Sequence, residues 1–380
     1  MKGQILYTEL CDLLGIQYPI IQAGMGMLQP YVPPVSTSPE LVAAVSNAGG
    51  IGILGPSGVS PEEVANYIRK TKALTDKPFG VDLIFAGSLS GTAVGNMQDL
   101  KNQIPPEYKA LLKSLMEKYE IPEVEVEPTI WRTMLDPEIA RKQFEVVLEE
   151  KVPVMVSGLG TPPFVVSECH ARGIKVLSAV GNLKTACRAA ELGVDAIIVE
   201  GWGAGSHSGR IDNLVLIPPV VDAVKPIPVI AAGGIADGRQ IAASLMLGAA
   251  GVWIGTRFLA TPEAAIPDWY KQLIIQAGDE GTQKNAYWTG RLNRHYKSPV
   301  DEALETSGLK PLPMPLQGLL TFDFMAGAIK AGKYELSGQL MGQGTAMIKK
   351  LKPAAQIMEE LVTEAVAALD TAGHFINKES

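Results

Sequence analysis

The stretch Ile197-Ile-Val-Glu-Gly-Trp-Gly-Ala-Gly-Ser-His-Ser-Gly209 joins the end of an apolar strand to a glycine-rich loop that carries one of only four histidines in the chain. A strand that is apolar on consecutive residues is typical of a parallel sheet covered on both faces. Glycines without a Cβ let a ligand approach the backbone and let amides turn toward an anion or a flat ring. An imidazole takes or gives a proton near neutral pH, so His207 is the leading candidate for catalysis.

The same unit, a short β-branched run followed by an amphipathic segment, recurs on both sides of this stretch. Several of the expected helices open with a capping residue or an early proline. Eight units predict an α/β fold, a (β/α)8 TIM barrel over residues 1–261, although a doubly wound open sheet would give a similar pattern. The expected strands cover residues 18–24, 50–54, 79–84, 152–156, 175–179, 196–199, 228–232 and 251–254, and the expected helices cover 38–48, 60–71, 136–150, 162–172, 182–192, 214–224 and 237–247.

Two segments do not fit the repeat. Residues 86–135 follow the third strand and include an amphipathic stretch at 107–119, which predicts an inserted lid or flank. Residues 262–380 follow the eighth strand and hold helical patterns at 268–277, 317–331 and 353–372. This C-terminal extension is expected either to cap the barrel mouth as a small helical domain or to form the contact of a homodimer.

Composition excludes several classes of protein. The chain has 380 residues and a net charge of -7, so no general attraction to nucleic acid or to an anionic membrane surface is expected. No apolar run has the roughly 18–20 residues of a membrane span, and the N-terminal residues lack the pattern of a signal peptide, which favours a cytoplasmic enzyme with a small-molecule substrate. Cys11, Cys169 and Cys187 form no CxxC pair, so neither a disulfide framework nor a metal site is expected, and the latter two suit buried thiols in helices.

Glycines cluster at the predicted ends of three strands. The first strand leads into Gln22-Ala-Gly-Met-Gly26, where Met25 is well placed to touch a planar ligand. The seventh and eighth lead into Ala231-Ala-Gly-Gly-Ile-Ala-Asp237 and Gly255-Thr-Arg-Phe258. Loops rich in free amides after strands seven and eight of this fold commonly cradle a phosphate, aided by a helix N-terminus, and predict a phosphorylated ligand.

Gly201-Trp-Gly-Ala-Gly205 is a poor match for a dinucleotide fingerprint, although its glycines alternate after a strand. That motif belongs to the first βαβ unit and needs an acidic residue at a strand end about 20 residues later. The residues at that distance, Val220-Val-Asp-Ala-Val224, fall in a predicted helix. A Rossmann dehydrogenase is therefore not favoured.

At these loops the chain resembles the nitronate monooxygenase family, formerly the 2-nitropropane dioxygenases, whose FMN-binding barrel is shared with flavin-dependent enoyl-acyl-carrier-protein reductases. The resemblance runs from about residue 18 to residue 260, with a weaker echo at Leu340-Met-Gly-Gln-Gly344 and Pro353-Ala-Ala-Gln-Ile357. It rests on Pro19-Ile-Ile-Gln-Ala-Gly-Met25, Ser38-Pro-Glu-Leu-Val-Ala-Ala-Val-Ser-Asn-Ala-Gly-Gly-Ile-Gly52, Phe79-Gly-Val-Asp82, Ala204-Gly-Ser-His-Ser-Gly209, Ile230-Ala-Ala-Gly-Gly-Ile235 and Ile254-Gly-Thr256.

The resemblance implies a site for FMN and a role for each matching residue. His207 corresponds to the histidine that serves as base. The residues expected to contact the cofactor are Gly24, Met25 and Gly26 along the ring, Glu200, Gly205 and Ser206 beside it, Gly233, Gly234, Gly255 and Thr256 around the phosphate, and Ala23, Asp82 and Ser157 elsewhere in the pocket.

Three positions depart from the family pattern. Ser206 stands where a second glycine usually precedes the histidine, and Asp82 stands where asparagine is common. An ionised Asp82 could accept a hydrogen bond but not donate one. Trp202-Gly203 replaces a commoner acidic pattern, so the substrate contacts are left open.

The resemblance implies oxidation of alkyl nitronates, with FMN reduced by the substrate and reoxidised by molecular oxygen. A second possibility keeps the flavin but makes the enzyme an NAD(P)H-dependent enoyl-thioester or quinone reductase. An IMP-dehydrogenase-like enzyme would need a nucleophilic cysteine in a loop after a strand, where this chain has none. A non-enzymatic flavin- or phosphate-binding scaffold that acts through its tail, with Lys349, Lys350 and Lys352, is the remaining alternative.

Other polar residues carry weaker expectations. His170 and His374 suit solvated or structural positions. Arg291, Arg294 and His295 lie in the extension, which could fold over the mouth and bring them to an anionic substrate or phosphate. Ser178, like Ser157, falls at a strand end and is expected to line the pocket.

Overall fold

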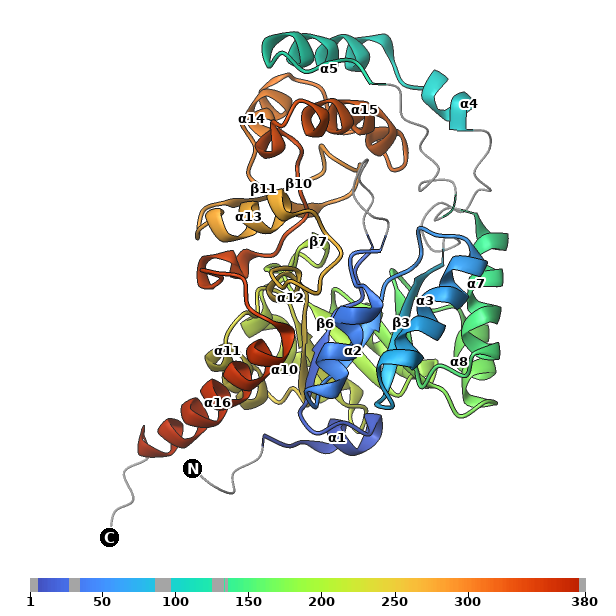
Figure 1. Cartoon of the computed structure of the whole chain (residues 1–380), viewed down its shortest axis with the longest axis vertical. Helices are drawn as coiled ribbons and strands as arrows, with labels where there is room; N and C mark the ends of the chain where they lie inside the picture. The colour runs from blue at the N-terminus through green and yellow to red at the C-terminus, as the bar shows by residue number, and fades with distance from the viewer. Residues whose placement is uncertain (1–5, 27–34, 86–96, 125–132, 134–135, 376–380) are drawn as a thin grey trace.

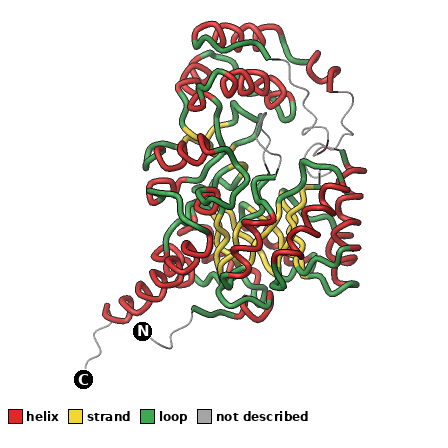
Figure 2. The backbone as a smooth tube through the Cα atoms, in the orientation of Figure 1, coloured by secondary structure: helices red, strands yellow, loops and turns green. Residues whose placement is uncertain are grey.

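A closed barrel of eight parallel strands forms the body of the molecule (Figures 1 and 2). The computed structural model describes residues 6–26, 35–85, 97–124, 133 and 136–375. In ring order the strands are β1 (Ile20–Gln22), β2 (Ile51–Leu54), β3 (Phe79–Ile84), β4 (Val154–Gly158), β5 (Lys175–Val180), β6 (Ala196–Glu200), β8 (Val229–Ala232) and β9 (Gly251–Ile254).

The register between the first and last strands closes the ring. Ile21 on β1 is paired with Ile51 on β2 and with Trp253 on β9, all in parallel. The TIM barrel prediction is confirmed, each strand lies where its apolar run predicted it, and the alternative of an open sheet is wrong.

Consecutive apolar residues in the strands serve two cores. Ile21, Ile53 and Ile198 are buried inside the ring, whereas Val81, Met155 and Val199 are buried between the ring and the surrounding helices. Because both faces of each strand are covered, period-two alternation is absent, as expected for a parallel barrel.

Helices follow the strands and surround the ring. Ser60 and Asp237 form capping boxes at the starts of α3 and α11, and Ser38 caps α2. These contacts satisfy amides that the first turn leaves without partners. The surrounding helices are α2 (Pro39–Asn47), α3 (Pro61–Leu74), α7 (Pro137–Glu149), α8 (Pro163–His170), α9 (Leu183–Glu191), α10 (Asn213–Val224) and α11 (Gly238–Met246), and α1 (Glu9–Leu14) precedes the first strand.

The last long helix, α16 (Ala354–Ala372), returns to the outside of the barrel. It packs against α11 and α2, the helices on either side of the gap that follows the eighth strand (Figure 1). Gly238 on α11 makes this approach close, because a Cβ there would lie 2.3 Å from the amide nitrogen of Ala365. The extension therefore does not lie wholly over the mouth, and its final helix completes the outer ring.

The rest of the extension meets the inserted segment above the barrel (Figure 1). Leu112 and Leu115 of the insertion share one apolar core with Leu319, Phe322 and Phe324 of the extension. The elements of the insertion are α4 (Met97–Asn102) and α5 (Pro106–Lys118). After the short helix α12 (Thr256–Leu259), which follows the last barrel strand, the extension contains α13 (Asp268–Gln276), α14 (Pro299–Thr306), α15 (Leu316–Lys330) and the 3-10 turns η2 (Tyr334–Leu336) and η3 (Gln343–Met347), and a third 3-10 turn, η4 (Gly373–Phe375), follows α16.

A small antiparallel sheet joins the extension to the barrel. It has the order β10 (Thr282–Asn285), β11 (Asn293–Tyr296) and β7 (Ser206–His207). Sequence analysis predicted none of these three strands. Among the described residues, no helix is both long and apolar enough to cross a membrane.

Candidate active site

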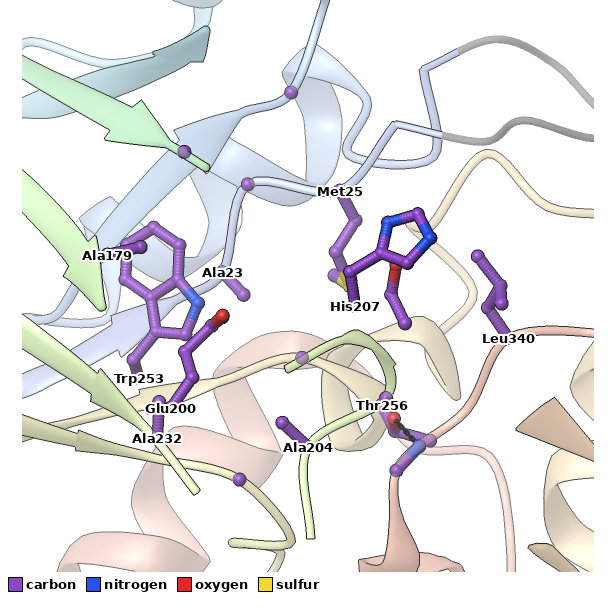
Figure 3. A pocket seen from close by; sticks show the side chains of 18 of the residues that line it. Ala23, Met25, Ala179, Glu200, Ala204, His207, Ala232, Trp253, Thr256 and Leu340 are labelled. Carbon is purple, nitrogen blue, oxygen red and sulfur yellow. Dashed lines mark hydrogen bonds between the residues drawn. The ribbon is translucent and has the colours of Figure 1, made fainter. Parts of the chain in front are cut away.

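A cavity opens where the carboxyl ends of the barrel strands meet the extension (Figure 3). Its empty volume, with the open solvent at the mouth included, is about 1530 Å³. Its wall contains most of the predicted site: Ala23, Gly24, Met25, Gly26, Asp82, Glu200, Gly205, Ser206, His207, Gly233, Gly234, Gly255 and Thr256.

Small residues at the strand ends leave room for a flat ligand. Ala23, Ala179 and Ala232 lie in the wall with the indole of Trp253 (Figure 3). Met25 also lies there, and its sulfur would be 3.4 Å from a Cβ at Gly255. The loops after β1 and β9 therefore touch, as convergence of strand ends in a barrel requires.

The predicted phosphate cradle forms where the loops after β8 and β9 meet the extension. Gly233 and Gly234 have φ values of 115° and 73°, which a residue with a Cβ rarely adopts. The amide of Gly342 donates a hydrogen bond to Thr256 Oγ1 at 2.8 Å, so the extension contributes to the same corner. A helix N-terminus was also expected here: α12 begins at Thr256 without a side-chain cap, whereas the first turn of α11 is capped by the carboxylate of Asp237.

Arg257 brings a positive charge to this part of the wall. Its side chain is buried, its Nη1 has no hydrogen-bond partner among the described residues, and its Nη2 lies 3.9 Å from the carboxylate of Glu360. Among the described residues of the cavity wall, Arg257 is the only one with a lysine or arginine side chain. Arg257 belongs to the predicted phosphate-binding loop at residues 255–258, but no sequence pattern predicted a role for its side chain.

Two carboxyl groups, Asp82 and Glu200, lie in the cavity wall. Burial raises the pKa of Glu200 to about 7, although the charge of Lys284 acts in the opposite direction. Burial also raises the pKa of Asp82 well above its usual range, and the negative charge of Glu200 raises it further. Asp82 Oδ1 has no hydrogen-bond partner among the described residues. A protonated Asp82 can donate a hydrogen bond, as the asparagine common at this position does.

His207 lies in the wall of the same cavity as Met25 and Glu200 (Figure 3). Burial lowers its pKa to about 4, with a further contribution from the positive charge of Arg291. The ring is therefore neutral at pH 7, and one of its two nitrogens can accept a proton. Its Nε2 lies 2.9 Å from Thr289 Oγ1 in the extension.

The loop that carries His207 is held by side chains of the extension. Lys284 Nζ donates to the Trp202 carbonyl at 3.2 Å and to Ser208 Oγ at 2.9 Å. Arg294 Nε and Nη2 donate to the same carbonyl at 3.3 and 3.2 Å. Both cations also lie over the Trp202 ring, at 4.2 and 5.6 Å from its centroid. This contact explains a tryptophan where the family pattern is commonly acidic.

Several predicted site residues do not line the cavity. Ser157 Oγ donates to the Gly160 carbonyl at 2.7 Å, and Ser178 Oγ bonds with Thr161 Oγ1 at 2.7 Å. Both serines are buried, so their hydroxyl groups support a neighbouring loop. Arg294 and His295 are buried as well, their polar groups bond to protein atoms, and neither side chain lines the cavity.

The remaining histidines and the cysteines lie away from the cavity wall. His170 Nε2 is 2.8 Å from the carboxylate of Asp195, and His374 is exposed. Cys169 is buried as predicted, but Cys187 is only half-buried. No described cysteine lines the cavity, so an IMP-dehydrogenase-like nucleophile is absent there, and no described cluster of His, Cys, Asp or Glu could hold a metal ion.

The residues that sequence analysis missed come mostly from the extension. Thr289 and Lys284 contact the His207 loop, and Met314, Met341 and Gly342 line the cavity. Only the echo at residues 340–344 signalled any of them in the sequence.

Comparison with known proteins agrees with this geometry. The family model described as nitronate monooxygenase matches residues 7–364. The chain belongs to the nitronate monooxygenase family. Among solved structures, a nitroalkane oxidase from Streptomyces ansochromogenes is 28% identical with a TM-score of 0.78, covering 96% of this chain and 99% of that one. FabK from Thermotoga maritima is 29% identical with a TM-score of 0.73, covering 98% and 100%.

One relative that is named for a different reaction has a comparable sequence identity to this chain. A Rhodococcus jostii dehydrogenase of a hydroxylated methyl-oxo-octahydroindene-carboxyl-CoA is 32% identical, over 90% of this chain and 79% of its own length. Relatives of this chain thus carry names for different substrates, and membership of the nitronate monooxygenase family indicates an oxidoreductase that acts on small molecules.

Proposed function

We propose that the protein is an FMN-dependent oxidoreductase that oxidises alkyl nitronates with molecular oxygen. The observation that carries the proposal is the position of His207, an unprotonated imidazole in the wall of the cavity that also contains the glycine cradle. The nitroalkane oxidase at 28% identity supports the same substrate class.

The residues present fit a flavin mononucleotide. Gly233, Gly234, Gly255 and Thr256 would surround its phosphate, with Arg257 supplying positive charge. Small side chains around Trp253 would accommodate the ring, and Asp82 Oδ1, buried without a partner, is available to a polar ring atom. Bound FMN would accept electrons from the substrate and deliver them to oxygen.

His207 would take a proton from the carbon next to the nitro group when the substrate arrives as a neutral nitroalkane. General-base catalysis contributes about 10²- to 10⁴-fold. The lowered pKa keeps the ring neutral at pH 7, so that one ring nitrogen is free to accept this proton. A nitronate supplied as the anion has already lost this proton and needs only to be positioned.

The test uses the purified full chain. Its visible spectrum should show bound flavin, and His207→Asn should keep that spectrum while turnover of a neutral nitroalkane falls by about 10²-fold or more. Turnover of the pre-formed nitronate should fall much less. Unchanged turnover of the neutral substrate would remove His207 from the base role, and a colourless protein would contradict the cofactor assignment.

A second candidate, an NAD(P)H-dependent enoyl-thioester reductase, is favoured by the apolar part of the wall. Met314, Leu340 and Ile348 line the cavity, and the carboxyl-CoA dehydrogenase among the relatives is named for a thioester. Anaerobic mixing with NADH or NADPH separates the two functions. Rapid bleaching of the flavin would favour the reductase, and an unchanged spectrum would favour the nitronate oxidase.

A further inference from the structure

A chain of buried side chains runs from His207 into the extension. Thr289 Oγ1 lies 2.9 Å from His207 Nε2 and 3.0 Å from Asn293 Nδ2. Asn293 Oδ1 lies 3.0 Å from His295 Nδ1, and His295 Nε2 lies 2.9 Å from Asp301 Oδ1. The four residues beyond His207 are between 0% and 7% exposed, so water does not compete for these contacts. The backbone also connects the two ends of this path, because Asn293 on β11 is paired with His207 on β7 in the antiparallel sheet.

The carbonyl of Arg291 fixes the direction of the hydrogen bonds at Asn293. Asn293 Nδ2 lies 3.0 Å from this oxygen, which can only accept, so the amide group of Asn293 must face it. Asn293 Oδ1 therefore faces His295 and accepts from Nδ1. At its other nitrogen, His295 faces a carboxylate that also accepts.

Both nitrogens of His295 consequently donate, which makes the ring an imidazolium paired with the Asp301 carboxylate. Trp288 Nε1 donates to Asp301 Oδ1 at 2.8 Å, and the amide of Ser298 donates to Oδ2 at 2.9 Å. Burial alone would raise the pKa of Asp301, but the hydrogen bond and charge of His295 hold it below its usual value. An ionised, fully bonded Asp301 thus anchors the far end of the chain.

Thr289 links His207 to this chain. Its hydroxyl accepts from Asn293 Nδ2 at 3.0 Å and from the Arg291 amide at the longer distance of 3.4 Å, and its one hydrogen has two acceptors in reach, the Arg291 carbonyl at 3.0 Å and His207 Nε2 at 2.9 Å. When that hydrogen goes to the Arg291 carbonyl, Nε2 of His207 donates to Thr289 and Nδ1 has the lone pair that a base needs. We propose that Thr289 is a positioning residue that fixes the tautomer and orientation of His207 through this chain, so that Nδ1 is the atom that receives the substrate proton.

This inference rests on the proposed function only for the substrate step. The structural part is tested without substrate, by imidazole ¹⁵N NMR of the histidine-labelled holoenzyme at pH 7. The chain has four histidines, so single substitutions assign every signal. We expect His207 as the Nε2–H tautomer and His295 with both nitrogens protonated. A His207 signal from the Nδ1–H tautomer, or a neutral His295, would overturn the proposal.

The functional part is tested with a matched pair of variants. Thr289→Val removes the acceptor at nearly the same volume, and Thr289→Ser retains it. We expect Thr289→Val to reduce kcat for a neutral nitroalkane by about 10- to 100-fold, the usual effect of losing a group that orients a reactive one. KM and the flavin spectrum should hardly change, and the His207 signal should show mixed tautomers. Thr289→Ser should retain the wild-type kcat and the single tautomer of His207.

Two outcomes distinguish failure of the Thr289 proposal from failure of the proposed function. If the wild-type protein has the expected tautomers but no nitroalkane activity, the proposed hydrogen-bond chain is supported and the proposed substrate is wrong. If Thr289→Val retains full activity and a single His207 tautomer, Thr289 does not position the ring.

Discussion

The cavity has two walls of different construction. On the barrel side, glycines and alanines such as Gly24, Gly233 and Ala232 leave space for a ligand between the larger side chains. On the extension side, apolar residues line the cavity, and behind them Lys284 and Thr289 hold the histidine loop by side-chain hydrogen bonds. The barrel wall therefore determines what can bind, and the extension determines how His207 is presented to it.

A glycine substitution in the barrel wall should have the largest effect. A Cβ at Gly233 would lie 2.9 Å from the Ala204 amide nitrogen, on a backbone with φ of 115°. Gly233→Ala should therefore displace the cradle and weaken FMN binding by about 100-fold or more, since overpacking costs about 1–3 kcal/mol before strain is added. Flavin retention during dialysis measures the effect.

The matched control is Gly193→Ala. Gly193 also has a positive φ, 79°, but a Cβ there would meet nothing within 4 Å. It should lower stability and leave flavin binding intact. Equal flavin loss in both variants would show that backbone strain, and not the shape of the cradle, explains the result.

Glu200 places a half-buried carboxyl group in the barrel wall. Burial raises its pKa from 4.5 to about 7, so between these values the native state binds more protons than the unfolded state. Stability should consequently fall as pH rises through this range, by up to about 3 kcal/mol. Glu200→Gln should remove this part of the pH dependence, as measured by urea unfolding at pH 5 and pH 8. An identical decrease in both proteins would assign the pH dependence to other groups.

A substitution on the extension should have a smaller effect on folding but a selective one on catalysis. Lys284→Met removes the donor to the Trp202 carbonyl and to Ser208 Oγ. A hydrogen bond to a charged group contributes about 1.5–3 kcal/mol, so unfolding free energy should fall by about 2 kcal/mol. Turnover of a neutral nitroalkane should fall by about tenfold, since displacing His207 slows its proton transfer.

Lys297→Met is the control for this prediction, because Lys297 is exposed and adjoins the same hairpin. It should change neither quantity. If Lys284→Met lowers flavin affinity as strongly as Gly233→Ala does, the two walls do not have the separate roles in ligand binding and in positioning His207 that are described above.

The two walls also differ in how well the sequence predicts them. All eight barrel strands were predictable, because runs such as Ala196–Glu200 are apolar on consecutive residues and end in glycine loops. The strands of the extension, Thr282–Asn285 and Asn293–Tyr296, are polar throughout, and their burial depends on partners distant in sequence. No periodicity marks Thr289 as the partner of His207, because the two residues are 82 positions apart and meet only through the fold.

Ser157 shows what the position of a residue at a strand end does not determine. Its place at the end of a strand predicted a cavity residue, but the hydroxyl is satisfied by the Gly160 carbonyl of its own loop. A strand end determines which rim a residue lies on, and the side-chain hydrogen bond determines whether it faces the ligand.

Ser206 lies where the two walls meet and should give the smallest effect. Its φ is 62°, a left-handed conformation that a residue with a Cβ adopts at a cost of about 1–2 kcal/mol. Ser206→Gly should relieve this strain, and because glycine loses more entropy on folding, the net gain in unfolding free energy should be about 0.5–1 kcal/mol. Lys151→Gly, with φ of 48° after α7, should stabilise the protein similarly without touching the site. If Ser206→Gly also lowers kcat while Lys151→Gly does not, the strained serine keeps the His207 loop rigid between the barrel and the extension.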